Sequence, residues 1–186
     1  MNVLGVHVGH DSSAALVQDG KIIADVSEER YIRVKHYSGL PLKSIQFCLE
    51  YAGIGSSDID VVAFSQSSPP RGAKYLFPDL DFRQPIRVRG IIKEAVLHRV
   101  SPERRGLPLY IQPFKTSRAA EVELIEHHEA HAASAYYTSG RPLSERVVVA
   151  TLDGEGQGVS CAIWRGEHGR LEPLCKLGTS GSLGWF

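Results

Sequence analysis

Residues 3–26 read VLGVHVGHDSSAALVQDGKIIADV, which is three apolar runs separated by two short polar stretches. An aspartate-glycine pair, Asp19-Gly20, lies between the second and third runs, and this pair between strand-like segments is the strongest short signal for a β-hairpin. We therefore expect the chain to open with a three-stranded antiparallel meander.

A similar pattern returns near the end of the chain. Residues 147–152 and 159–164 are again apolar, and residues 153–158 between them are acidic and glycine-rich, as expected for a turn. Residues 171–177 would be a third strand. The repetition indicates a duplicated unit, so we expect residues 1–142 to form a first lobe and residues 143–186 the incomplete start of a second. We also expect the sequence to be the N-terminal portion of a longer protein.

Between the two openings, apolar residues recur at helical spacing after Pro41 and stop before Gly53. Proline suits the start of a helix and glycine its end, so a helix of about three turns is predicted there. Residues 59–64 and 122–125 have the composition of buried strands. Together with the meander, these elements predict an α/β fold.

The stretch from about residue 65 to 117 is rich in proline and poorly patterned, which indicates an insertion rather than core. Within it, residues 83–118 are locally basic. Such a segment either solvates a long insertion, which we favour, or attracts a phosphate-bearing ligand.

Overall composition is that of an ordinary globular protein, with 186 residues, 42% of them hydrophobic, and no net charge. Zero net charge gives no general reason to expect nucleic-acid binding. No apolar run is long enough for a membrane span and no signal peptide is visible, so a cytoplasmic protein is expected. Three widely spaced cysteines, Cys48, Cys161 and Cys175, favour buried apolar thiols over a disulfide framework or a metal cage.

The histidine-rich stretch 127–131 reads HHEAH and begins a run typical of a helix. His127 and His131 lie four positions apart, so on a helix they would share one face and could bind one metal ion. Zinc, iron, copper and nickel all accept imidazole, so spacing does not select the metal. A zinc-peptidase site is excluded because Glu129 and the histidines have the wrong register. The alternative is a solvated or capped helix end.

Two tight turns, residues 9–13 and 153–158, could present backbone N–H groups to phosphates, because glycine allows close approach. Ser12, Gly154 and Gly156 are the candidate phosphate-binding residues, and Asp153 would lie near the phosphates as a magnesium or iron ligand. Alternatively, each turn only connects two strands. Two similar turns with a histidine helix between them favour the phosphate interpretation.

A charged segment, residues 28–36, follows the third predicted strand. Arg33, Lys35 and His36 could hold a phosphate, carbonyl or carbamate oxygen, and arginine offers a planar fork for this purpose. A solvated loop is the alternative.

Taken together and in order, these motifs resemble those of the O-carbamoyltransferases that act on nodulation factors, cephalosporins and aminoglycosides. The stretches that carry the resemblance are GHDSSAAL at 9–16, EER at 28–30 with Arg33 and Lys35-His36, HHEAHAASA at 127–135, DGEG at 153–156 and GSLG at 181–184. The chain is similar to the N-terminal part of that family.

The resemblance implies an actin-like ATPase (ribonuclease H-like) fold, with the first lobe and the beginning of the second in this sequence. It also implies that carbamoyl phosphate and ATP give carbamoyl adenylate, whose carbamoyl group passes to a hydroxyl of a small-molecule acceptor. His127 and His131 correspond to ligands of Fe(II) or another divalent metal, and ATP would bind with magnesium. The missing ligands and the adenosine site are expected beyond Phe186, so activity of this portion alone is doubtful.

By the same resemblance, His10 and Asp11 on the first turn are expected to bind or deprotonate the acceptor. Two other readings remain open: another actin-like ATP-dependent phosphotransferase or ATPase, such as a sugar kinase, and a non-catalytic binding module. The sequence also leaves a homo-oligomeric state open.

Overall fold

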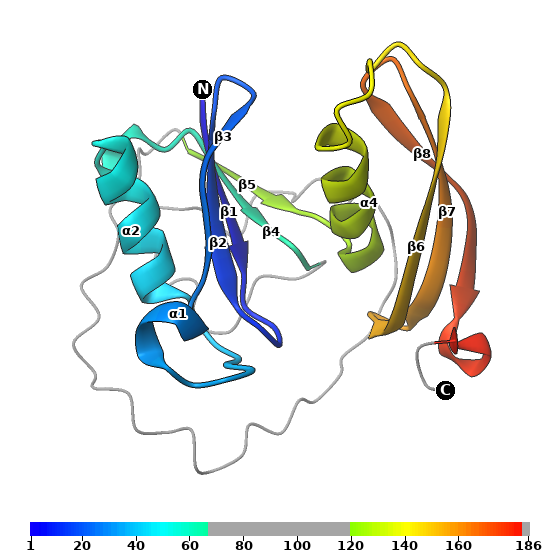
Figure 1. Ribbon diagram of the computed structural model, residues 1–186, viewed down its shortest axis with the longest axis horizontal. Helices are drawn as coiled ribbons and strands as arrows, with labels where there is room; N and C mark the ends of the chain where they lie inside the picture. The colour runs from blue at the N-terminus through cyan, green and yellow to red at the C-terminus, as the bar shows by residue number, and fades with distance from the viewer. Residues whose placement is uncertain (67–119, 184–186) are drawn as a thin grey trace. The chain divides into compact units, whose positions relative to one another are not determined.

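The computed structural model describes residues 1–66 and 120–183, which fall into two compact units (Figure 1). The first unit comprises residues 1–66 with 120–124, and the second comprises residues 125–183. The units divide at residue 124, and the lobe boundary at 142 stays a prediction. The predicted insertion and its basic segment lie outside the described residues, apart from Ser65 and Gln66.

The first unit contains a five-stranded sheet of order β3-β2-β1-β4-β5. Its strands are β1 (Asn2–His7), β2 (Ser13–Gln18), β3 (Lys21–Ser27), β4 (Val61–Phe64) and β5 (Glu121–Leu124). The first three strands pair antiparallel, while β4 pairs parallel with β1 and β5 parallel with β4. The predicted opening meander is confirmed, as are the two later strands within a residue or two.

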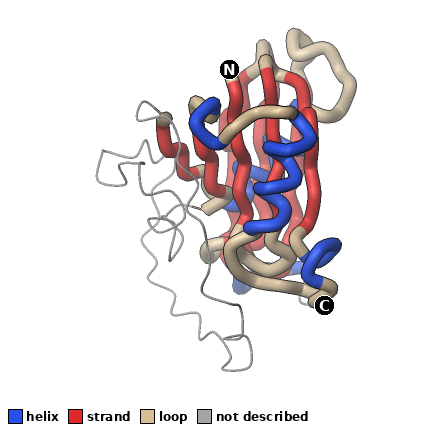
Figure 2. The backbone as a smooth tube through the Cα atoms, turned by 90° about the vertical axis from the view of Figure 1, so that its left-hand side faces the viewer, coloured by secondary structure: helices blue, strands red, loops and turns tan. Residues whose placement is uncertain are grey.

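Helix α2 (Leu42–Ala52) packs on this sheet, against β2 and β3 (Figure 2). Its apolar face, with Ile45, Cys48 and Leu49, is buried together with Leu4 and Phe64 from the strands. The helix ends where predicted, at Gly53 with φ of 67°. It begins at Leu42, so Pro41 is the residue that precedes the helix rather than its first residue.

The carboxylate of Glu28 holds the start of α2. This residue precedes the short helix α1 (Glu29–Ile32) and is buried, with 3% of its surface exposed. It accepts hydrogen bonds from the backbone N–H groups of Lys43 and Ser44 and from the Ser44 hydroxyl. These N–H groups would otherwise lack a partner at the helix start. A 3-10 turn, η1 (Ser56–Asp58), then leads into β4.

The second unit consists of one helix on a three-stranded antiparallel sheet of order β6-β7-β8. Its elements are α4 (His127–Tyr137), β6 (Val147–Gly156), β7 (Val159–Glu167), β8 (Arg170–Gly178) and the 3-10 turn η3 (Thr179–Gly181). Ala132 and Tyr136 of α4 pack on Val149, Ala162 and Trp164 of the sheet. The helix and three strands predicted here are confirmed, and the helix belongs with the sheet that follows it.

The predicted turn at residues 153–158 is wrong in its extent. Strand β6 continues to Gly156, and the chain reverses at Gln157-Gly158, where φ is 55° and 82°. Two successive positive φ angles are the geometry of the favoured two-residue hairpin. The β6–β7 register shifts between Leu152 and Gly156, so Asp153-Gly154 lies in a bulge rather than in the turn.

The two sheets and their helices confirm the mixed α/β class. Across the described parts of the chain, no helix combines the length and apolar character needed to cross a membrane.

Candidate functional site

Helix α4 begins with its backbone N–H groups already occupied. The buried carboxylate of Glu126 accepts from the N–H groups of His128 and Glu129, and the side-chain oxygen of Gln157 accepts from that of His127 at 2.9 Å. Lys176 forms an ion pair with Glu126 at 3.0 Å. Glu126 and Gln157, rather than the histidines, therefore cap the helix, and the capped-end interpretation does not explain the histidine side chains.

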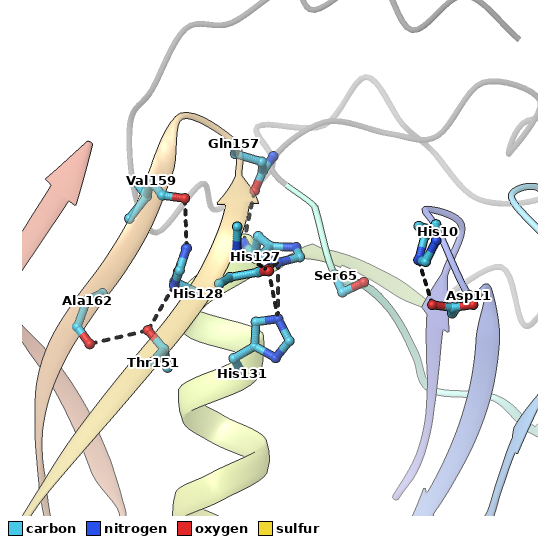
Figure 3. A network of polar contacts seen from close by, with 12 residues as sticks. His10, Asp11, Ser65, His127, His128, His131, Thr151, Gln157, Val159 and Ala162 are labelled. Atoms are coloured by element: carbon cyan, nitrogen blue, oxygen red, sulfur yellow. Dashed lines mark hydrogen bonds and ion pairs between the residues drawn. The ribbon is translucent and has the colours of Figure 1, made fainter. Parts of the chain in front are cut away.

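Three donor atoms from α4 and β6 converge on one point. His127 Nε2 lies 2.8 Å from Asp153 Oδ2. His131 Nε2 lies 3.0 Å from His127 Nε2, and both imidazoles are labelled in Figure 3. His131 Nε2 is also 3.7 Å from Asp153 Oδ2. The predicted ligands His127, His131 and Asp153 thus come together within the second unit.

The donor set fits a divalent transition metal. Bonds of about 2.0–2.1 Å from nitrogen and oxygen ligands to one ion place the ligand atoms roughly 3 Å apart, as they are here. Two imidazoles and one carboxylate are typical of zinc sites and of non-haem iron sites with open positions. The partial exposure of His131 and Asp153, 54% and 36%, leaves access for further ligands.

The bulge in β6 directs Asp153 toward the histidines. Ser182, which is buried and follows η3, donates its hydroxyl to the Asp153 and Gly154 carbonyl oxygens, at 3.3 and 2.8 Å. Ser182 of the GSLG stretch therefore supports the bulge that carries the candidate ligand. Sequence reasoning used this stretch only as a family motif and missed the role of Ser182.

Asp153 is held in its ionised form. Desolvation alone would raise the pKa of its carboxyl, but hydrogen bonds from His127 and from the Gly154 N–H, together with the histidine charges, lower the pKa below its ordinary value. An ionised carboxylate is the form that binds a metal.

The two predicted phosphate-binding glycines have other partners. The N–H of Gly154 donates to the Asp153 side chain at 2.6 Å. A Cβ at Gly156 would lie 2.7 Å from His127 Nε2, so glycine is required there for the imidazole to fit. The observed contacts give Gly156 a packing function beside the metal ligands, and phosphate binding by either glycine stays a prediction.

His128 points away from the other two imidazoles and is fully buried. Its Nδ1 lies 2.8 Å from the Thr151 hydroxyl and its Nε2 lies 2.9 Å from the Val159 carbonyl (Figure 3). Since both ring nitrogens have partners on the sheet, His128 is not among the converging donors.

A second polar cluster lies on the first unit, where the Asp11 carboxylate contacts both His10 and His36. Asp11 lies 2.5 Å from His10 Nδ1 and 3.0 Å from His36 Nδ1, and the two imidazoles stack at 4.7 Å. Desolvation would raise the pKa of Asp11, but the hydrogen bond and charge of His36 and the charge of His10 lower it. The carboxylate therefore orients both rings, and the candidate acceptor-binding residues His10 and Asp11 are joined by His36.

The loops that carry this cluster are tied together by backbone hydrogen bonds. The Ser12 N–H donates to the Tyr37 carbonyl at 3.0 Å, and Asp11 and His36 adopt left-handed φ angles of 62° and 54°. Left-handed backbone at non-glycine residues is uncommon and concentrates at functional sites. Ser12 is itself buried with its N–H occupied, so the structure does not present this predicted phosphate ligand at the surface.

The other predicted substrate-binding residues do not join His36. Lys35 forms an ion pair with Glu29 at 2.9 Å, and Arg33 is exposed at the end of α1. Sequence reasoning also missed His7, whose Nδ1 contacts the Ser65 hydroxyl at 2.6 Å and whose Nε2 contacts the His10 carbonyl at 3.0 Å. His7 ends β1, immediately before the turn, and that position was the available signal.

Comparison with known proteins gives matches along the whole chain. Residues 2–186 match the family described as carbamoyltransferase N-terminus. The chain is 33% identical to the nodulation protein NolNO of Sinorhizobium fredii over 94% of its own length and 24% of that protein. It is 29% identical to an uncharacterised protein of Synechocystis, over 98% of its length and 30% of that protein. The chain thus spans less than a third of these two relatives.

Among solved structures, YeaZ from Pseudomonas aeruginosa matches 96% of this chain and 68% of its own, with 15% identity and a TM-score of 0.45.

Proposed function

The chain belongs to the carbamoyltransferase family, and from that premise we propose that it serves in carbamoyl transfer to a hydroxyl group of a small molecule. The carbamoyl donor in this proposal is carbamoyl phosphate, activated with ATP and magnesium as carbamoyl adenylate. The convergence of His127 Nε2, His131 Nε2 and Asp153 Oδ2 is the observation that carries the proposal. We also propose an actin-like fold for the chain, on the basis of the same family membership.

The three converging side chains would hold Fe(II) or another divalent metal. When bound, such an ion supplies Lewis-acid polarisation of a phosphate or carbonyl oxygen. The chain's own contribution is to keep both imidazoles and the carboxylate pointed at one position: Glu126 and Gln157 fix the helix start, and Ser182 fixes the bulge.

His10 is proposed to accept the proton of the acceptor hydroxyl at Nε2, because its Nδ1 faces the Asp11 carboxylate. In the step, the acceptor oxygen bonds to the carbamoyl carbon, the bond from that carbon to the adenylate oxygen breaks, and AMP leaves. General-base catalysis of this kind contributes roughly 10²- to 10⁴-fold to a rate. Arg33 and Lys35 are proposed to contact the phosphate or carbamoyl oxygens of the donor.

The test uses the full-length protein with carbamoyl phosphate, ATP and a panel of hydroxyl acceptors, and measures carbamoylated product and AMP. His10→Ala should lower product formation by about 10²-fold or more. His168→Asn removes an exposed imidazole from the β7–β8 turn and should leave product formation unchanged. Undiminished turnover in His10→Ala would remove His10 from the mechanism, and absence of ATP- and carbamoyl-phosphate-dependent product would refute the proposed function.

A further inference from the structure

His128 is the one histidine of the 127–131 stretch that does not face the candidate metal position, yet it is the most deeply buried. It is 0% exposed, whereas the side chains of His127 and His131 are 23% and 54% exposed. A buried imidazole is costly unless both ring nitrogens are paired. Both are paired here, and both partners belong to the sheet rather than to the helix.

Both partners of the ring lie on the sheet. The Val159 carbonyl can only accept, so His128 Nε2 carries the proton and donates at 2.9 Å. His128 Nδ1 lies within hydrogen-bond distance of the Thr151 hydroxyl, at 2.8 Å. The same hydroxyl donates to the Ala162 carbonyl at 3.2 Å, so it is enclosed between β6 and β7.

This arrangement joins the two elements that carry the candidate ligands. On α4, His128 is adjacent to His127 and three residues before His131, and its ring lies edge-on to both, with centroids 5.5 and 6.2 Å away. On β6, Thr151 lies two residues before Asp153 and just before the bulge that carries it. The His128–Thr151 contact therefore sets the position of the helix ligands relative to the strand ligand (Figure 3).

We propose that His128 is a positioning residue of the metal centre, which fixes α4 on the β6–β7 hairpin so that His127, His131 and Asp153 converge. This inference rests on the metal site of the proposed function. His128 itself is not among the three converging donors. Residues that orient metal ligands typically change metal affinity roughly 10- to 100-fold when replaced.

The test is Co(II) titration of the full chain, followed by the visible absorption of the bound ion, at a temperature where circular dichroism shows each variant folded. His128→Leu should weaken Co(II) binding roughly 10- to 100-fold and alter the absorption spectrum. Thr151→Val should also weaken Co(II) binding and alter the absorption spectrum, but by less than His128→Leu. His128→Gln, which can still donate to the Val159 carbonyl, should fall between wild type and His128→Leu. Thr151→Ser, which keeps the hydroxyl, is the matched control and should match wild type.

A second readout needs no metal. In chelator, amide hydrogen exchange along α4 should be faster in Thr151→Val than in Thr151→Ser, because one link between the helix and the sheet is gone. If His128→Leu does not fold, the Thr151→Val and Thr151→Ser pair decides the question.

Folded His128→Leu or Thr151→Val with wild-type Co(II) affinity and spectrum would overturn the positioning role while leaving the metal site intact. A wild-type chain that binds no Co(II) would instead overturn the metal site and this inference with it.

Discussion

Gly156 lies against the ring of His127. Adding a methyl group at this residue, as in Gly156→Ala, therefore tests the position of the imidazole. A Cβ at residue 156 would lie 2.6 Å from His127 Cγ and 2.7 Å from Nε2, closer than van der Waals contact permits. The imidazole would have to leave its position 2.8 Å from Asp153. Gly156→Ala should therefore weaken metal binding by about 10-fold or more, measured by Co(II) titration.

Gly181→Ala is the matched control, because a Cβ there meets nothing within 4 Å and the residue does not have a positive φ. It should bind Co(II) as tightly as wild type. Equal affinity of Gly156→Ala and Gly181→Ala would show that the ring of His127 is not held where the structure places it.

Asp153 should make stability depend on pH in a defined direction. Its pKa is lowered in the folded chain, despite the opposing effect of desolvation, by the His127 and Gly154 hydrogen bonds and the histidine charges. A group with a lowered folded pKa stabilises above its unfolded pKa, about 4, and loses that stabilisation as the pH falls through the folded pKa.

In metal-free protein, the difference in free energy of unfolding between wild type and Asp153→Asn should therefore be largest above about pH 4 and shrink below it. Urea denaturation at a series of pH values measures this difference. A difference that persists undiminished into strong acid would mean that the carboxylate is not stabilised by its histidine partners.

Cys48 should be chemically inert in the folded chain. Burial, with a smaller contribution from the charge of Asp25, raises the pKa of its thiol to about 11. Cys175 is exposed on β8. A short iodoacetamide pulse at neutral pH, read by mass spectrometry, should modify Cys175 and spare Cys48 until denaturant is added, since the thiolate is the reactive form. Comparable modification of both would contradict the packing of α2 on the first sheet.

At the scale of elements, the start of α2 depends on a residue from outside the helix. Glu28→Ala would remove the carboxylate that accepts hydrogen bonds from the Lys43 and Ser44 N–H groups and from the Ser44 hydroxyl. Both Glu28 and Ser44 are buried. The free energy of unfolding should fall by about 1–3 kcal/mol, measured by chemical denaturation. Glu50→Ala, on the exposed part of the same helix, should change it by no more than about 0.5 kcal/mol. Equal effects would show that Glu28 does not cap α2.

Elements set by local pattern were predictable, and those set by distant partners were not. Three short apolar runs and Asp19-Gly20 were sufficient for the meander, and Gly53 for the end of α2. The second hairpin was misplaced because Asp153-Gly154 has the same local signal, while the strand continues through a bulge held by Ser182. Nothing within the 153–158 stretch reveals a hydrogen bond from a residue almost thirty positions later.

The candidate site shows the same division. Helical spacing predicted that His127 and His131 share a face, and that spacing is local. Glu126 was missed as a cap because glutamate is not among the preferred capping residues. His36 was grouped with its sequence neighbours Arg33 and Lys35, whereas the left-handed backbone at His36 turns its ring toward Asp11.

For the whole molecule, our central proposal is that the second unit holds a functional divalent metal at His127, His131 and Asp153. The nodulation protein and the Synechocystis protein are each more than three times as long as the matched part. The substrates and the acceptor are therefore proposals about the full protein, whereas the candidate metal ligands His127, His131 and Asp153 lie within the described residues.

The most direct measurement is the metal content of the purified chain after anaerobic incubation with Fe(II) and gel filtration, determined by mass spectrometry of the elements. Wild type and His168→Asn should each retain about one ion per chain, and the His127→Ala/His131→Ala double variant should retain almost none while remaining folded. Wild-type protein without bound metal, or a double variant with an undiminished metal content, would contradict the claim.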